Sequence, residues 1–241
     1  MTVPVMTIPK LATFITLCLI SQVCCSASLA KQKSAQHQSK VANAETRTIA
    51  PRQAFKMQSD TLRKLMLQLY ECNPKDLHKS TKVSAEELVQ WVFEGPFGWK
   101  FEAIKKAQSV NAISLSFDEN YQGDRVLSLI TGLHTMLVKA YGGENEFKFT
   151  KRISPENLQL AIQNIEVTKF KLLNTSNHAD PINTDCSNNQ IKEIENTLTN
   201  TIEQTHQHLL TLGHDGSTIE NTRENISAVD LQSAELTELH D

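Results

Sequence analysis

The sequence has little net charge, few aromatic residues and no apolar run long enough to cross a membrane. Its 24 basic and 27 acidic side chains leave a formal net charge of −3, which argues against general nucleic-acid binding. The apolar run at residues 11–23 is shorter than the roughly twenty residues that a spanning helix requires. We therefore expect no nucleic-acid partner and no transmembrane span once a leader has been removed.

The sequence also lacks the motifs of the common catalytic sites. Its histidines and cysteines do not follow the spacing of a metal site. It has neither a serine, histidine and aspartate order nor a glycine-flanked nucleophile of the kind that hydrolases use. We therefore predict no catalytic residue, no cofactor and no metal ligand.

The first thirty residues have the pattern of a signal peptide. Lys10 supplies a basic start, residues 11–23 supply an apolar core, and residues 24–30 are mostly small. This pattern predicts export to the periplasm or the extracellular space. We expect residues 1–27 to be removed by cleavage after Ala27.

Two alternatives for this leader stay open. Cys24 and Cys25 raise the possibility of a lipoprotein, anchored to the envelope through an acylated cysteine. A lipobox has Gly, Ala or Ser before that cysteine, whereas Val23 precedes Cys24, so we favour cleavage without acylation. Translation starts at Met1 or at Met6, because the same basic and apolar segment follows both.

Composition divides the rest of the chain into three parts. Residues 28–53 are basic and have almost nothing to bury, which predicts a flexible basic linker. Residues 54–213 contain the apolar periodicity of one domain with a sizeable core. Residues 214–241 are acidic, with Arg223 as their only lysine or arginine, which predicts an acidic mobile tail.

The apolar spacing within residues 54–213 is mostly helical. Apolar side chains recur three or four positions apart, with a break at Asn73-Pro74 and helix starts at Ser84 and Ser154. Residues 126–141 are apolar nearly all round, so this helix should be surrounded by the others. The sequence predicts a mainly α fold, a single-domain bundle of five to six helices.

Two short stretches depart from the helical pattern. Ile113, Leu115 and Phe117 alternate with serines, and Phe147 and Phe149 alternate with polar residues. Alternation with a period of two is typical of strands. We expect the two stretches to pair as a small two-stranded β element that packs on the helices, because an isolated strand pair is weak.

Only two cysteines, Cys72 and Cys186, remain after removal of the leader. Both lie at ends of expected helices, and an exported chain meets an oxidising compartment. The two thiols either pair as a disulfide or stay separate and buried. Sequence alone leaves both alternatives open.

The best candidates for chemistry lie between residues 118 and 134. Asp118 begins a segment with alternating oxygen ligands that resembles the start of a calcium loop, although the twelfth position is not a glutamate. Asp124 is expected to cap the following helix, which makes a structural role for this segment the favoured interpretation. Arg125 and His134 follow on that helix and complete the set of functional candidates.

Several segments together resemble a known family. The segments are ECNPKDL, GDRVLSLITGLHTMLVKAYGG and SPENLQLAIQNIEVTKFKLL, with a phenylalanine-rich stretch before the last one. Over residues 60–175 this arrangement is similar to an exported protein family of proteobacteria without an assigned activity. The resemblance implies a bacterial envelope location and implies no functional residue.

Two hypotheses of function follow. The favoured one is a noncatalytic binding or interaction module of the bacterial envelope, whose partner is another envelope protein or a lipid. The alternative is an envelope enzyme with an acid/base or metal-assisted site near residues 118–134. Convergence of two side chains among Asp118, Asp124, Arg125 and His134 in a deep cleft would favour the enzyme, and a filled core with one exposed apolar groove would favour the module.

Overall fold

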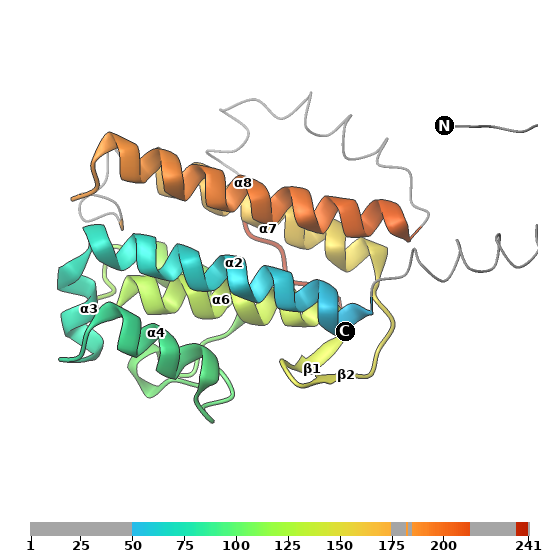
Figure 1. Cartoon of the computed structure of the whole chain (residues 1–241), viewed down its shortest axis with the longest axis horizontal. Coiled ribbons are helices and arrows are strands. Elements are labelled where there is room, and N and C mark those ends of the chain that lie inside the picture. Colours follow the sequence, from blue (N-terminus) through green and yellow to red (C-terminus); the bar gives the residue numbers. More distant parts are fainter. Residues whose placement is uncertain (1–49, 175–181, 183–184, 213–234, 241) are drawn as a thin grey trace, which may run out of the picture. The chain divides into compact units, whose positions relative to one another are not determined.

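The computed structural model describes residues 50–174, 182, 185–212 and 235–240. Within these residues the chain forms a mainly α single domain, which confirms the predicted fold class (Figure 1). A two-stranded antiparallel sheet accompanies the helices. The elements are α2 (Pro51–Cys72), α3 (Pro74–Ser80), α4 (Ala85–Glu94), the 3₁₀ helix η1 (Glu102–Ile104), α5 (Ser109–Phe117), α6 (Arg125–Ala140), β1 (Gly143–Asn145), β2 (Lys148–Phe149), α7 (Pro155–Leu173) and α8 (Asn188–Thr211).

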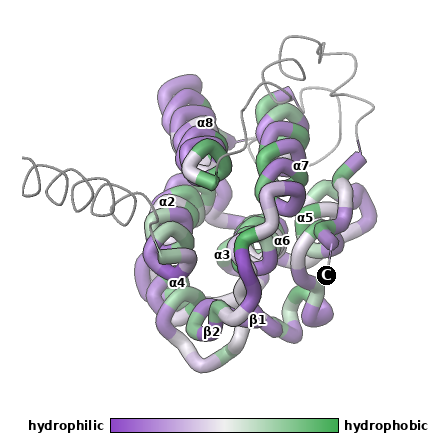
Figure 2. The backbone as a smooth tube through the Cα atoms, turned by 90° about the vertical axis from the view of Figure 1, so that its right-hand side faces the viewer, coloured by the Kyte–Doolittle hydropathy of each residue, from purple (hydrophilic) through white to green (hydrophobic). Residues whose placement is uncertain are grey.

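Helix α6 lies at the centre of the domain. Every side chain from Arg125 to Ala140 is buried except those of Thr135 and Lys139. Helices α2, α5 and α7 contact it, and α8 packs on α2 and α7 (Figures 1 and 2). The prediction of a helix surrounded by the others is therefore confirmed.

Local sequence signals set most helix boundaries. Helix α2 ends before Asn73, and α3 begins at Pro74, which needs no backbone donor in the first turn. The side chains of Ser84 and Ser154 accept hydrogen bonds from the third backbone N–H of α4 and α7. These boundaries agree with the sequence, whereas α3 and α5 are helices that apolar spacing did not predict.

The prediction of a strand at Ile113, Leu115 and Phe117 is wrong. These residues belong to α5, in which Val110, Ile113 and Ser116 are buried at a helical spacing of three. The alternation with serines misled because those serines are compatible with a helix. Ser116 Oγ donates a 2.6 Å hydrogen bond to the carbonyl oxygen of Ile113 within the same helix.

The small β element exists with a different first strand. Strand β2, which contains Phe149, pairs in antiparallel fashion with β1, the segment directly after α6. Gly142 begins this hairpin with a positive φ of 77°, a conformation that favours glycine. Phe147 lies in the turn and is 70% exposed.

Helix α5 approaches α6 closely because α6 presents small side chains there. A Cβ atom at Gly132 would lie 2.6 Å from the backbone nitrogen of Ile113 and 2.8 Å from the carbonyl oxygen of Ser109. Ser128, on the same face, donates a 2.8 Å hydrogen bond to the carbonyl oxygen of Ala112. The missing side chain at Gly132 is thus a condition for this helix pair.

A disulfide joins Cys72, the last residue of α2, to Cys186, just before α8. The two Cα atoms are 4.7 Å apart and the cysteines are separated by 114 positions in the sequence. In the chain-entropy description, closure of so long a loop stabilises the fold by about 4 to 5 kcal/mol. The sequence left open whether the two thiols pair or stay separate, and in the structure they are paired.

Two boundaries drawn from composition differ from the structure. Helix α2 begins at Pro51, so the last three residues of the expected linker, 28–53, are helical. Residues 235–240 belong to the expected mobile tail, 214–241, yet they pack on the domain, with Leu239 only 4% exposed. Residues 1–49 and 213–234, which include the expected signal peptide, lie outside the described residues.

One further finding concerns membranes. Among residues with described positions, no helix combines the length and the apolar character needed to cross a bilayer. The longest helix, α8 with 24 residues, exposes lysine and glutamate side chains along one side. Its buried side, which includes Ile194, Leu198 and Ile202, packs on α2 and α7.

We predict that Gly132→Ala destabilises the domain. Helix propensity alone would predict the opposite result, because alanine stabilises a helix by about 1 kcal/mol relative to glycine. The new methyl group must push α5 away from α6, and overpacking of this kind costs about 1–3 kcal/mol, so we expect a net loss. Urea unfolding measures the difference.

The exposed Asn200 of α8 provides the control for this test. Asn200→Ala changes the helix propensity at an exposed position where the new side chain displaces no neighbour. It should therefore leave the free energy of unfolding unchanged or slightly raised. A Gly132→Ala protein as stable as the Asn200→Ala protein would contradict the close approach of α5 and α6.

Candidate functional site

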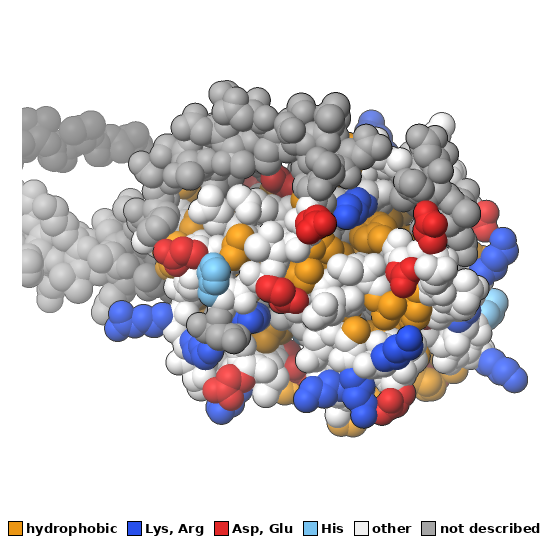
Figure 3. Space-filling view, turned by 180° about the vertical axis from the view of Figure 1, so that it is seen from behind, with side chains coloured by type: hydrophobic (Ala, Val, Ile, Leu, Met, Phe, Trp, Pro, Cys, Tyr) orange, Lys and Arg blue, Asp and Glu red, His pale blue; other side chains and the backbone are white. Residues whose placement is uncertain are grey.

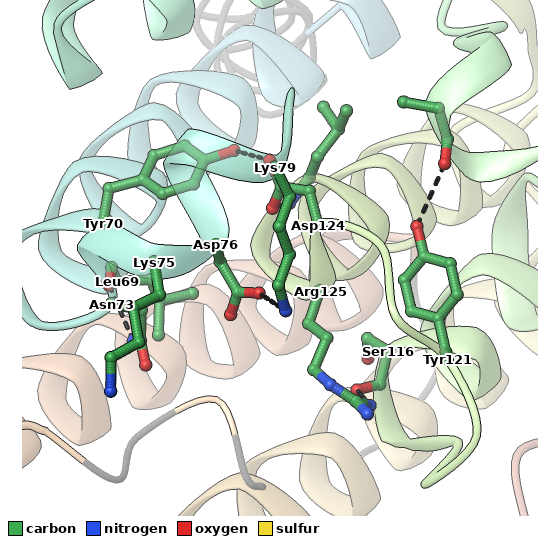
Figure 4. Close-up of polar contacts among 12 residues, drawn as sticks. Leu69, Tyr70, Asn73, Lys75, Asp76, Lys79, Ser116, Tyr121, Asp124 and Arg125 are labelled. Carbon is green, nitrogen blue, oxygen red and sulfur yellow. Dashed lines mark hydrogen bonds and ion pairs between the residues drawn. The ribbon is translucent and has the colours of Figure 1, made fainter. Parts of the chain in front are cut away.

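Asp124 is the residue that caps α6, as the sequence predicts. One carboxylate oxygen accepts a 2.8 Å hydrogen bond from the backbone nitrogen of Leu127, and the other accepts a 2.7 Å hydrogen bond from the Tyr70 hydroxyl (Figure 4). Burial raises the pKa of Asp124 to about 6, and the nearby charge of Asp76 adds to the rise. The two hydrogen bonds favour the carboxylate and limit the shift.

Arg125 points away from Asp124 and holds the loop before α6. Its guanidinium donates a 2.9 Å hydrogen bond to the carbonyl oxygen of Ser116 (Figure 4) and a 2.7 Å hydrogen bond to the carbonyl oxygen of Asp118. It also lies 5.9 Å from the centre of the Tyr121 ring. Arg125 therefore joins the end of α5 to the start of α6, and this role is structural.

The Asp118 side chain does not face the other candidates. It is exposed, and its oxygen accepts a 2.9 Å hydrogen bond from the backbone nitrogen of Asn120 in the same loop. Over the part of the chain that the structure describes, no three His, Cys, Asp or Glu side chains gather as metal ligands would. The loop has the hydrogen bonding of a turn.

His134 lies inside the aromatic core. Its ring stacks on Trp99 with 3.5 Å between centroids, and the rings of Phe55 and Phe93 meet it edge-on. Burial lowers the pKa of His134 well below its ordinary value, so the ring is neutral at pH 7. His134 is ten positions after Asp124, about 15 Å along the helix axis, so the two do not form one site.

The arrangement that sequence reasoning missed is a groove filled by residues 235–240 of the same chain, drawn in red in Figure 1. Asn164 of α7 donates to the carbonyl oxygen of Thr237 at 2.7 Å and accepts from its backbone nitrogen at 2.8 Å. Asn157 donates to the carbonyl oxygen of His240 at 2.9 Å and accepts from its nitrogen at 2.8 Å. Each amide thus pairs with both the N–H and the C=O of one residue.

The spacing of these two asparagines matches an extended peptide. Asn157 and Asn164 are seven positions apart on α7, which is about 10.5 Å along a helix. Thr237 and His240 are three positions apart, and an extended chain covers about 10 Å over that interval. The two side chains therefore repeat at the same distance as the two peptide groups that they bind.

Helices α5 and α6 supply the rest of the groove. Lys139 of α6 donates a 2.7 Å hydrogen bond to the carbonyl oxygen of Leu239, and Asn111 of α5 donates a 3.3 Å hydrogen bond to the carboxylate of Glu238. The Leu239 side chain is buried, and Leu236 packs partly against the core. The segment is thus held through main chain, through one acidic side chain and through apolar contact.

A sequence signal for this groove exists, although it is faint. Asn157 and Asn164 are polar residues on the apolar side of α7, beside Leu158, Ala161 and Ile165. Buried asparagines require hydrogen-bond partners, so they indicate a polar contact on that side. Leu236 and Leu239 are likewise apolar residues in an acidic stretch.

Comparison with known proteins gives no match to a protein-family model, a curated protein or a solved structure. The proposals below therefore rest on the residues and contacts of this chain.

We predict that Asp124 makes stability depend on pH. Its pKa in the folded chain is raised to about 6 from an ordinary value of 3.8, so folding favours the protonated acid. The stabilisation is fully present below about pH 4 and is lost as the pH rises through 6. A shift of about two pKa units corresponds to roughly 3 kcal/mol.

Asp124→Asn tests this prediction because it keeps an oxygen for the helix cap and removes the titration. Relative to the unchanged protein, the variant should gain up to about 3 kcal/mol of stability between pH 4 and pH 7. Urea unfolding of both proteins across this range measures the gain. A difference that stays constant with pH would contradict the raised pKa.

Proposed function

We propose that this chain is a noncatalytic binding protein of the bacterial envelope whose groove holds the main chain of an extended peptide. The single observation that carries the proposal is the double pairing of Asn157 and Asn164 with the backbone of Thr237 and His240. In the structure the chain's own residues 235–240 occupy the groove.

The hydrogen bonding of the groove favours a protein partner over a lipid. A carboxamide side chain has one acceptor and two donor hydrogens, which match the N–H and C=O of any peptide group except that of proline. Five of the hydrogen bonds of the groove go to main-chain atoms, so they are available to many sequences. A lipid does not offer alternating N–H and C=O groups at this spacing.

An external peptide must compete with a tethered one. The bound segment is covalently joined to the domain that it occupies, and a tethered peptide of this kind has an effective concentration in the millimolar range. A partner therefore displaces the segment only if it binds better or is itself held nearby. Residues 235–240 act as an internal competitor for the groove.

The alternative, an envelope enzyme with a site near residues 118–134, has less support. Asp124 caps a helix, Arg125 binds two carbonyl oxygens, and His134 is enclosed by aromatic rings. Each candidate side chain has a structural task in a different place. We find no observation among the described residues that favours catalysis over binding.

Two features support export. The first 27 residues have the basic, apolar and small-residue pattern of a signal peptide. The bond between Cys72 and Cys186 is typical of proteins that fold in oxidising compartments. We propose that the mature protein works in the periplasm or outside the cell, with a lipid anchor as the alternative.

We predict that protein recovered from a bacterial envelope fraction begins near Ser28 and carries no acyl chain. Cleavage after Ala27 removes both cysteines of a possible lipobox, so no acceptor for a lipid remains. Intact-mass measurement and N-terminal sequencing check this. A first residue of Cys24 or Cys25 with the mass of an added diacylglycerol would establish the lipid anchor instead.

We predict that the emptied groove binds a peptide added in solution. In full-length protein, Thr237→Pro removes the N–H that Asn164 accepts, and Leu239→Asp disfavours burial, so the pair of changes frees the groove. A fluorescent peptide with the sequence of residues 231–241 should then bind saturably, as measured by anisotropy. The unchanged protein should bind it far more weakly.

Added to the emptied protein, Asn164→Ala should weaken binding of the peptide about thirtyfold, because two hydrogen bonds of about 1 kcal/mol each are lost. Asn200→Ala, on the exposed side of α8, is the matched control and should leave the affinity unchanged. Equal affinity in all three proteins, or no saturable binding, would contradict a groove that reads the peptide main chain.

A further inference from the structure

A second hollow of about 540 Å³ lies between the loop before α5, the last turns of α6 and the β hairpin. Its lining includes Trp99, Lys100, Ser109, Lys139 and Lys151. The volume is in the range of pockets for small organic ligands. The hollow is separate from the peptide groove, although Lys139 contributes to both.

The wall of this pocket contains unusual backbone. Trp99 and Ser109 have positive φ values of 58° and 50°, and Gly98 has a φ of 54°. For residues other than glycine this left-handed conformation costs of order 1 kcal/mol, and such strain gathers at ligand sites. At Ser109 the conformation is held by a 2.7 Å hydrogen bond from its backbone nitrogen to Thr135 Oγ1.

The charge of the pocket is positive. Lys100, Lys139 and Lys151 line it together with Glu144 and Glu146. The charge of Glu144 is compensated by Lys148, whose Nζ lies 2.5 Å from its carboxylate. With Glu144 paired and Lys139 bonded elsewhere, the two positive charges of Lys100 and Lys151 outweigh the one negative charge of Glu146.

Basic side chains also gather in places on the face shown in Figure 3, between acidic and apolar groups.

Within the part of the chain that has described positions, Lys100 and Lys151 form no ion pair. Lys139 is already bonded to the carbonyl oxygen of Leu239. Lys100 and Lys151 are therefore the ammonium groups that remain for a ligand.

A buried hydroxyl group without a hydrogen-bond partner in the described part of the chain also lines the pocket. Ser109 Oγ is buried and has no hydrogen-bond partner among the described residues. An unsatisfied buried hydroxyl costs free energy unless a ligand or water bonds to it. Ser109 is also the first residue of α5, whose N-terminus has no side-chain cap and a positive partial charge.

We propose that this pocket binds a small organic anion, with its acidic group at Lys100, Lys151 and Ser109 and its apolar part against Trp99 and Val138. The acidic group is a carboxylate or a phosphate, which share the negative charge and the acceptor oxygens that these donors match. The residues proposed to hold the anion differ from those that hold the peptide main chain, so either proposal stands if the other fails.

The test uses full-length protein and three probes: indole-3-acetate, phenyl phosphate and the neutral indole-3-acetamide. Titration followed by NMR should give saturable shifts for the amides of residues 98–109 and 139–151 with an anionic probe, and weaker or no shifts with the neutral amide. The better of the two anions identifies the acidic group. Equal binding of indole-3-acetamide and indole-3-acetate would overturn the proposal, as would the absence of saturation at millimolar concentration.

Variants separate the pocket from general attraction by surface charge. Lys100→Gln with Lys151→Gln should weaken binding of the anion roughly fivefold, as two exposed charge contacts imply. The control, Lys56→Gln with Lys64→Gln on the exposed side of α2, removes the same charge far from the pocket and should leave binding unchanged. An equal effect of both double variants would show that the anion binds by net charge alone and would overturn the proposal.

Discussion

Helix α6 has almost no side chain in solvent, and this burial dictates the positions of the elements around it. A helix of this kind must be covered on every side, which is what α2, α5 and α7 do. Its polar groups must also find partners inside the domain. Asp124 bonds to Tyr70, and Ser128 bonds to the backbone of α5. The missing side chain at Gly132 lets α5 come close enough for the second of these contacts.

The parts of the fold that follow from local sequence were predictable, and the parts that depend on distant contacts were not. The caps at Ser84 and Ser154 use atoms within three residues, so a short stretch of sequence contains the whole signal. The second half of helix α5 was mistaken for a strand because Ser116, which alternates with apolar residues, bonds its hydroxyl within the helix. The pairing of Asn164 with Thr237 joins residues 73 positions apart, and no local pattern indicates that partner.

The candidate site shows why residue type alone is a weak guide to chemistry. Asp124, Arg125 and His134 attracted attention as titratable groups on an apolar helix, and all three are buried. The burial of each has a structural cause that requires no substrate. Asp124 caps a helix, Arg125 bonds to two carbonyl oxygens, and His134 is enclosed by aromatic rings. The bound segment contacts Lys139 and three neutral asparagines, and reasoning from charge passes over the asparagines. The contacts of these three candidates hold parts of the domain core together, whereas the paired hydrogen bonds of Asn157 and Asn164 to one extended segment are of the type that can recognise a peptide.

Main-chain recognition also determines where the specificity of the groove must come from. The amides of Asn157 and Asn164 fit almost any extended peptide, so they contribute affinity without choosing a sequence. Selection then depends on the side-chain contacts, which are the buried Leu239 and the hydrogen bond between Asn111 and Glu238. These contacts favour a short segment with an acidic residue directly before a leucine. The tether gives the chain's own segment an advantage in concentration, so a competing segment must fit the leucine position better or be held close to the groove.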